Sequence, residues 1–242
     1  GGVLRSEAIG TFDSLNRYGQ RGDPVVSADS LYDKLMTDSD DEISVYYPLI
    51  AERVRYADDY SSITFFINKS ARFSDDKPIT ANDVKFSFEK FVAQGVPQFA
   101  KYYAFVTSVE VNNEHQVTFT LDGADKEKMM SLCSLTILPA HYWHDKDLAE
   151  PLKEVPVGSS GVTISDFKFG QYVIYKRLPD YWAKDLAVNK GQDNFDEYRF
   201  DYYRDQTVAF EAFKAGELNS HREFNAEKWA TQFDFPATQS GD

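Results

Sequence analysis

The chain has 242 residues and a net charge of −13 at pH 7, and 15% of its residues are aromatic. This length suits one large domain or two modest ones, with enough chain to bury a core. The negative charge argues against nucleic acid and anionic membranes as partners, because both would repel the protein.

Cysteine content and hydropathy restrict the fold further. Cys133 is the single cysteine, which excludes an internal disulfide and a cysteine zinc cluster and predicts a buried, inert thiol. No apolar run is long enough to span a membrane, and the sequence does not begin with a signal peptide.

The first half of the chain predicts short strands around one well-marked helix. In chain order we expect a strand at 3–9, a helix at 27–35, a strand at 63–67, a helix at 80–94 and a hairpin at 109–121. The second strand alternates Ile63, Phe65 and Ile67 with other residues, and Ser74 to Pro78 is typical of a turn.

The helix at 80–94 carries the strongest local signals in the chain. Thr80 and Asp83 have the spacing of a capping box, and Gly95 follows the last helical residue. Val84, Phe88, Phe91 and Val92 form one apolar stripe at helical spacing.

The second half alternates less regularly between strands and helices. We expect a short helix at 126–133, a strand from Val162, strands at 171–177 and 198–202, and a helix at 206–215 capped by Asp205. Hairpins mixed with helices in this order indicate a mixed α/β, or α+β, fold.

Two short motifs resemble catalytic or metal sites but are better explained as ordinary structure. Gly158-Ser-Ser-Gly161 lacks the spacing of a nucleophile elbow and predicts a backbone turn. His141 and His144 could share a helix face, but His115 and His221 lie far along the chain as further zinc ligands. The residues therefore give no positive case for an enzyme, a metal or a cofactor.

Several phrases, taken in order, resemble the family 5 extracellular solute-binding proteins of bacterial ABC importers. They are Leu31–Leu35, Tyr47–Glu52, Thr64–Ile67, Ala71–Asp75, Pro78–Ser87, Ile137–Pro139, Pro156–Gly158, Arg177–Trp182 and Lys214–Glu217. The tail from Arg222 to Pro236 is similar to the Yej-type subgroup with longer chains.

This resemblance implies a type II periplasmic-binding-protein-like fold. Residues 1–36 and 135–242 would form lobe I, and residues 37–134 a smaller inserted domain. Family members are much longer, so we expect an N-terminal fragment without the second large lobe. The family pattern continues the glycine turn as Gly-Pro-Tyr, but Val162 and Thr163 follow Gly161 here, which leaves the start of that strand open.

The family mechanism implies a hinged clamp that closes on an extended peptide and delivers it to an inner-membrane ABC permease. A periplasmic, monomeric, non-enzymatic protein without cofactor or metal is expected. A carrier of a metal chelate or a sugar on the same fold is the alternative, and a carboxylate-based hydrolase is a further one.

The resemblance also implies where ligand contacts lie within this chain. The predicted contacts are loop residues after the first strand, aromatic residues of the inserted domain, the glycine turn, and the segment after Gly216. They are Tyr18, Gln20, Arg21, Phe99, Tyr103, Ser160, Gly161, Arg222, Glu223 and Asn225.

Overall fold

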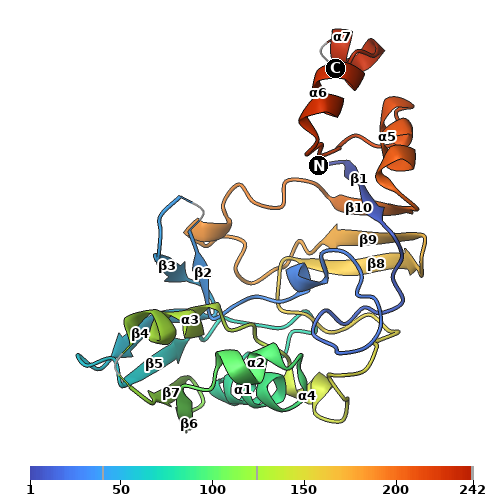
Figure 1. The fold of residues 1–242 in the computed structure, drawn as a ribbon. Coiled ribbons are helices and arrows are strands. Elements are labelled where there is room, and N and C mark those ends of the chain that lie inside the picture. Colours follow the sequence, from blue (N-terminus) through green and yellow to red (C-terminus); the bar gives the residue numbers. More distant parts are fainter. Residues whose placement is uncertain (40, 124, 241–242) are drawn as a thin grey trace.

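Three β-sheets organise the fold, and the two larger ones join strands that lie far apart in the sequence. This computed structural model describes residues 1–39, 41–123 and 125–240. The strand orders are β1-β10-β9-β8, β2-β3 and β4-β5-β7-β6. The sheet of β4 to β7 lies at one end of the molecule, and the sheet of β1 and β8 to β10 lies toward the other (Figure 1). The expected mixed α/β class is confirmed.

The sheet at the first end is antiparallel throughout. Its strands are β4 (Ala51–Tyr56), β5 (Ser62–Ile67), β6 (Val106–Asn113) and β7 (Gln116–Leu121). Alternation turns Ile63 and Phe65 toward the core, and the ring of Phe65 meets that of Phe119 at 5.9 Å. The predicted strand at 63–67 and the predicted hairpin are confirmed.

Helix α1 (Ala81–Gln94) packs against β6 and β7, and its start is capped as predicted. The N–H of Thr80 donates to the Asp83 carboxylate at 2.9 Å, and the two residues form a capping box. Val92 is 36% exposed, so the apolar stripe is narrower than the sequence predicts. The short helices α2 (Gln98–Tyr102) and α3 (Lys126–Ser131) follow.

The other large sheet joins the start of the chain to its last third. Its strands are β1 (Val3–Ile9), β8 (Val162–Lys168), β9 (Tyr172–Arg177) and β10 (Glu197–Tyr203). Strand β1 pairs in parallel with β10 and forms one edge of the sheet, whereas the other pairs are antiparallel. The expected strands are confirmed, and β8 begins at Val162.

Short elements lie in the connections between the longer strands and helices. They are β2 (Met36–Asp38), β3 (Tyr46–Pro48), α4 (Ala140–Trp143) and the 3-10 turns η1 (Ala28–Leu31), η2 (Leu132–Ser134) and η3 (Ala187–Asn189). Cys133 is buried, as predicted, and burial raises the pKa of its thiol to about 12.

The helix predicted at 27–35 is wrong, because only the single turn η1 forms there. Ser27 adopts a left-handed conformation with φ 59°, and the chain becomes extended at Tyr32. Leu35 is then held in extended backbone: its N–H donates to Leu135 at 2.9 Å and its C=O accepts from Ala51 at 2.7 Å. The apolar residues that have helical spacing are instead buried where three chain segments pack together.

The C-terminal part contains helices α5 (Gln206–Lys214), α6 (Ala226–Gln232) and α7 (Pro236–Ser240). Helix α5 was predicted, and Asp205 caps it by accepting from the N–H of Val208 at 3.0 Å. Helices α6 and α7 were not predicted, since the residues after Asn219 show little helical period.

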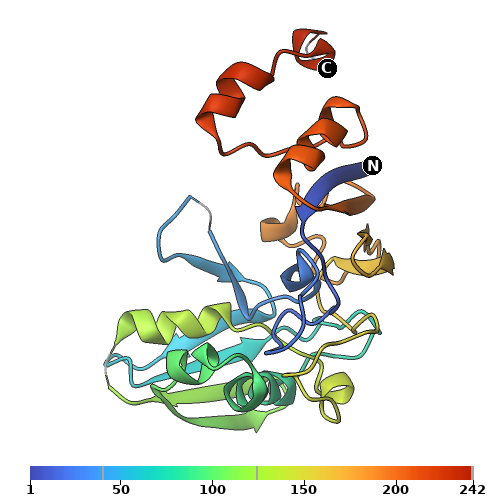
Figure 2. The ribbon, with the colours of Figure 1, turned by 45° about the vertical axis from the view of Figure 1, so that its right-hand side comes forward.

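One continuous cluster of buried apolar side chains joins the two large sheets, and it extends from Phe12 to Tyr175. Both chain termini lie toward the β1 end of the molecule, away from the sheet of β4 to β7 (Figure 2). Among the described residues, no helix combines the length and apolar character needed to cross a membrane.

Candidate functional site

The ten residues predicted to contact a ligand fall into three groups. Tyr18, Gln20, Arg21, Phe99 and Tyr103 are brought together where the loop after β1 meets the segment after α1. Ser160 and Gly161 lie on the glycine turn, and Arg222, Glu223 and Asn225 lie between α5 and α6. The role of each as a ligand contact stays a prediction.

The aromatic residues of the first group pack together with Phe91. We call Tyr18, Phe91, Phe99 and Tyr103 the aromatic wall. The ring of Tyr18 meets Phe91 edge-on at 4.8 Å, and Phe99 stacks on Tyr103 at 6.5 Å. Burial raises the pKa of Tyr18 to about 12, although a hydrogen bond to Thr136 opposes the effect. Tyr103 is buried, so Tyr18 and Phe99 offer more surface to a ligand.

Gln20 and Arg21 fix the same loop through polar contacts. The Nε2 of Gln20 donates to the carbonyl of Gly95 at 2.9 Å, and Arg21 forms an ion pair with Glu150. A Cβ on Gly95 would lie 2.7 Å from the Phe91 carbonyl, so glycine is required for this close approach.

A surface cavity of about 670 Å³ lies beside the aromatic wall, between the α2 region and α3. Tyr102 and Phe105 line it, and Tyr102 is 57% exposed. Tyr102 was not among the residues predicted to contact a ligand.

The glycine turn connects the two sheets rather than opening freely to solvent. The N–H of Gly158 donates to Ser74 Oγ at 3.0 Å, and a Cβ on Gly158 would lie 2.3 Å from the Leu31 carbonyl. The hydroxyl of Ser160 donates to the carbonyl of Ser30 at 2.5 Å. The predicted backbone turn is therefore present, and Ser160 serves packing between segments.

Asp33 and Tyr181 form a partly buried pair that was not predicted from the sequence. The Tyr181 hydroxyl donates to Asp33 Oδ2 at 2.6 Å. Tyr181 also lines two cavities, one of about 220 Å³ and one of about 320 Å³. Ser160 lines the first cavity and Gly161 the second. Burial raises the pKa of Asp33 to about 7, although the hydrogen bond from Tyr181 works in the opposite direction.

The segment after α5 runs along the first half of the open edge of β1. The Arg5 N–H donates to Asn219 Oδ1 at 2.6 Å, and the Arg5 carbonyl accepts from the N–H groups of Asn219 and Ser220 at 3.1 Å each. Both backbone groups of Arg5 thus face the open side. Because these groups alternate along a strand, Glu7 and Ile9 turn theirs to the same side. Ile9 is 41% exposed.

The third predicted group lies next to this edge. Asn225 caps α6 by accepting from the N–H groups of Glu227 and Lys228, at 2.9 and 3.1 Å. Glu223 accepts from the N–H of Asn225 at 2.7 Å. Local structure therefore occupies Asn225 and Glu223, whereas the exposed Arg222 is free to reach a ligand.

His221 adjoins the same edge and was not recognised in the sequence as a site residue. Its Nδ1 lies 2.9 Å from Glu7 Oε1, although the two residues are more than 200 positions apart. A single histidine in a polar segment carries no local signal for such a pairing.

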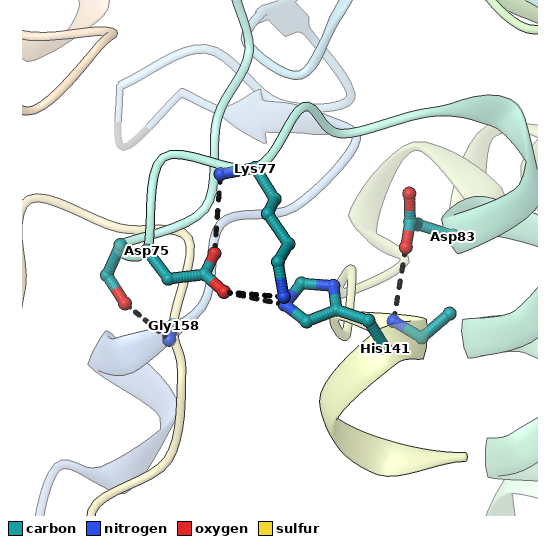
Figure 3. Close-up of polar contacts among 7 residues, drawn as sticks. Asp75, Lys77, Asp83, His141 and Gly158 are labelled. Atoms are coloured by element: carbon teal, nitrogen blue, oxygen red, sulfur yellow. Dashed lines mark hydrogen bonds and ion pairs between the residues drawn. The ribbon is translucent and has the colours of Figure 1, made fainter.

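The His141 and His144 pair belongs to local structure. Figure 3 shows Asp75 between Lys77 and His141, with the His141 Nε2 2.8 Å and the Lys77 Nζ 3.4 Å from Asp75 Oδ2. The Asp83 carboxylate accepts from the N–H of Ala140 at 3.1 Å. Within the described ranges, no group of three or more His, Cys, Asp or Glu side chains could hold a metal ion.

Sequence comparison places the chain among binding proteins. The model of the bacterial extracellular solute-binding proteins, family 5, matches residues 45–241. YejA of Escherichia coli K12, an uncharacterized protein, is 48% identical over 96% of this chain and 38% of its own length. A probable peptide-binding protein YejA of Agrobacterium fabrum is 37% identical over 100% of this chain and 40% of its own length.

Solved structures share the fold at lower identity. The oligopeptide-binding protein AppA of Bacillus subtilis, in complex with a nonapeptide, has a TM-score of 0.75 at 23% identity. The alignment covers 97% of this chain and 46% of AppA. NikZ of Campylobacter jejuni, in complex with Ni(L-His), has a TM-score of 0.72 at 18% identity, covering 90% of this chain and 42% of NikZ.

The family match extends over most of the chain, and the fold agrees with it. The chain spans about 40% of the length of the two relatives named above. It belongs to the family 5 bacterial extracellular solute-binding proteins, and within them it is of the Yej type.

Proposed function

We propose that this chain is part of a periplasmic substrate-binding component that captures extended peptides and delivers them to an ABC permease in the inner membrane. The complete protein acts as a monomer. Residues 1–36 and 135–242 form one lobe, and residues 37–134 form the inserted domain. Membership of the family supports a binding role, and the peptide-binding name of the Agrobacterium relative supports the ligand class.

The open edge of β1 is the observation that carries the proposal. The N–H and C=O groups of Glu7 and Ile9 face this side, beyond the part covered by Asn219 and Ser220. An extended peptide can add itself as a strand to such an edge through main-chain hydrogen bonds. Main-chain pairing does not read side chains, so it suits a protein that accepts many sequences.

Side-chain contacts would come from the predicted residues that remain accessible. Arg222 adjoins the β1 edge, because its N–H reaches Glu7 Oε1 at 3.5 Å. Tyr18 and Phe99 of the aromatic wall, together with Gln20, lie on the other accessible surface, near the exposed Tyr102. We propose that these residues contact the peptide and that Tyr103, Ser160, Glu223 and Asn225 support the surface by packing.

A carrier of a metal chelate is the second candidate, because a structural neighbour is in complex with Ni(L-His). That neighbour is 18% identical and shows only a shared fold. The backbone edge of β1 favours the peptide.

Native mass spectrometry of the full-length protein purified from cells distinguishes these ligands. The proposal predicts a distribution of bound masses that tandem fragmentation resolves into peptides of several sequences. A single species containing nickel, or an oligosaccharide ladder, would contradict it. Substituting Arg222→Ala and Tyr18→Ala, and measuring peptide affinity by calorimetry, then tests the contacts, and unchanged affinity in both variants would reject them.

A further inference from the structure

A cluster of three titratable side chains, formed by His221, Glu7 and Glu223, lies beside the open edge of β1. The His221 side chain is 1% exposed, and those of Glu7 and Glu223 are 11% and 10% exposed. His221 Nδ1 lies 2.9 Å from Glu7 Oε1, and Nε2 lies 3.7 Å from Glu223 Oε2. One imidazole therefore stands between two carboxylates that come from different parts of the chain.

Aromatic rings exclude water from the histidine. The His221 ring stacks on Phe213 at 5.3 Å and lies 5.2 Å from Phe210, both on α5. Phe233, which follows α6, lies 6.3 Å away. Charges in such a surrounding interact strongly, and an unbalanced charge is costly.

The balance of charge depends on the proton of His221. As imidazolium, it places one positive charge between the two carboxylates, and the contacts are ion pairs, because neither ring nitrogen has a hydrogen-bond partner among the described residues. As neutral imidazole, it leaves two carboxylates that repel each other across the ring.

Other charged and titratable groups around the cluster do not replace this charge. The pKa of Glu223 is lowered mainly by the hydrogen bond from the N–H of Asn225, and the positive charge of Lys228 in α6 also lowers it. In the sheet, Tyr203 of β10 is close to Glu7, and its pKa is raised mainly by burial and also by the negative charge of Glu7. Lys214 of α5 forms an ion pair with Glu211 at 2.6 Å.

We propose that protonated His221 is the positioning residue that holds the segment 219–225 against the edge of β1. Loss of the proton loosens this segment, and with it Arg222. Closure of the segment therefore depends on this positive charge, and loss of the charge weakens the closure. The link to peptide affinity rests on the proposed function, whereas the pH-dependent closure does not.

Hydrogen exchange of the ligand-free, full-length protein tests the closure directly. Amide protection of residues 218–232, corrected for the intrinsic pH dependence of exchange, is expected to be weaker at pH 8 than at pH 6, because the higher pH favours the neutral imidazole. His221→Gln should lack protection at both pH values, and His221→Lys, which keeps a charge, should be protected at both. His115→Gln, at a histidine beside Glu114 in the β6–β7 turn, is the control and should behave as wild type.

A second variant separates charge from packing. In the double variant Glu7→Gln with His221→Gln, the repulsion is removed, and protection should recover toward the wild-type level. Wild-type protection that does not change with pH, or a double variant no better protected than His221→Gln alone, would overturn the proposal.

Binding of peptides from a tryptic casein digest, measured by native mass spectrometry at pH 6 and pH 8, gives the functional readout. The proposal expects more bound peptide at pH 6 in the wild type and an equal amount at both pH values in His221→Lys. pH-dependent protection without any peptide binding would reject the proposed function and leave the closure intact. Peptide binding without pH-dependent protection would do the reverse.

Discussion

The unit of β5 and α1 and the unit of β1, β10 and α5 are both strand-and-helix arrangements, but they are held by different kinds of contact. In the first, the capping box of Thr80 and Asp83 and the alternation of β5 are local in sequence. In the second, β1 pairs with β10, and Glu7 meets His221 across most of the chain. The contacts that stabilise the first unit join residues close together in the sequence. The proposed binding edge in the second unit is assembled from residues far apart in the sequence.

Substitution of an aromatic side chain that packs against each unit should separate the two units most clearly, because Phe119 contacts Phe65 of β5 and Phe233 contacts Phe210 of α5. Phe119→Ala, in the fully buried face of β7, is expected to lower the free energy of unfolding by about 3–5 kcal/mol. Phe233→Ala, in the half-buried cluster after α6, should cost about 1 kcal/mol, because that segment is less enclosed. Urea denaturation measures both, and equal losses would contradict the difference between the units.

A close backbone contact outside both units should be nearly as sensitive. Gly158→Ala would place a Cβ 2.3 Å from the Leu31 carbonyl, which predicts a loss of about 2–3 kcal/mol by overpacking. Gly216→Ala is the matched control: no atom lies within 4 Å, but φ is +79°, so strain alone should cost about 1 kcal/mol. Thermal unfolding of both variants checks the order, and a reversed order would argue against a tight glycine turn.

Asp33 should make stability fall as pH rises. Its folded-state pKa is raised to about 7 from 3.8, so its contribution is full below pH 3.8 and is lost between there and pH 7. Asp33→Asn should therefore flatten the stability profile between pH 4 and pH 7. Asp180→Asn, an exposed position near Tyr181, is the control, and a wild-type profile in Asp33→Asn would contradict the assignment.

Asp75 should act in the opposite direction and more weakly. Burial by itself would raise the pKa of Asp75, but the hydrogen bond and charge of His141, together with Lys77, lower it overall. Its contribution is thus present above pH 3.8 and is lost as pH falls below that value. Denaturation at pH 5 and pH 3 should show that the free energy of unfolding falls less in Asp75→Asn than in the wild type. An equal fall in both proteins would show that the contacts of Asp75 do not contribute to this pH dependence.

The sequence was sufficient to locate a helix or strand where its structural signals lie within a few residues of one another. Alternation, capping and glycine placement located α1, the hairpin of β6 and β7, and α5 close to their observed bounds. The prediction of a helix at 27–35 was wrong, because Leu31 and Leu35 are buried against other chain segments and not on one face of a helix.

The candidate site was only partly predictable for the same physical reason. The resemblance singled out Arg222 and Glu223, which lie beside the β1 edge, and their role as ligand contacts stays a prediction. It missed Glu7 and His221, and also Asp33 and Tyr181, because each pair forms only when distant segments pack together. Burial and charge balance at these positions are properties of the fold, and no short motif carries them.

Peptide capture along the edge of β1 is the central claim, and backbone N-methylation tests it most directly. A peptide recovered from the purified full-length protein is synthesised with single N-methyl groups at successive positions, and each affinity is measured by calorimetry. Methylation at alternate amides should weaken binding about tenfold, because each of these loses a main-chain hydrogen bond, while the intervening positions should stay near the unmodified affinity. Uniform effects at all positions, or no effect at any, would contradict binding as an added strand.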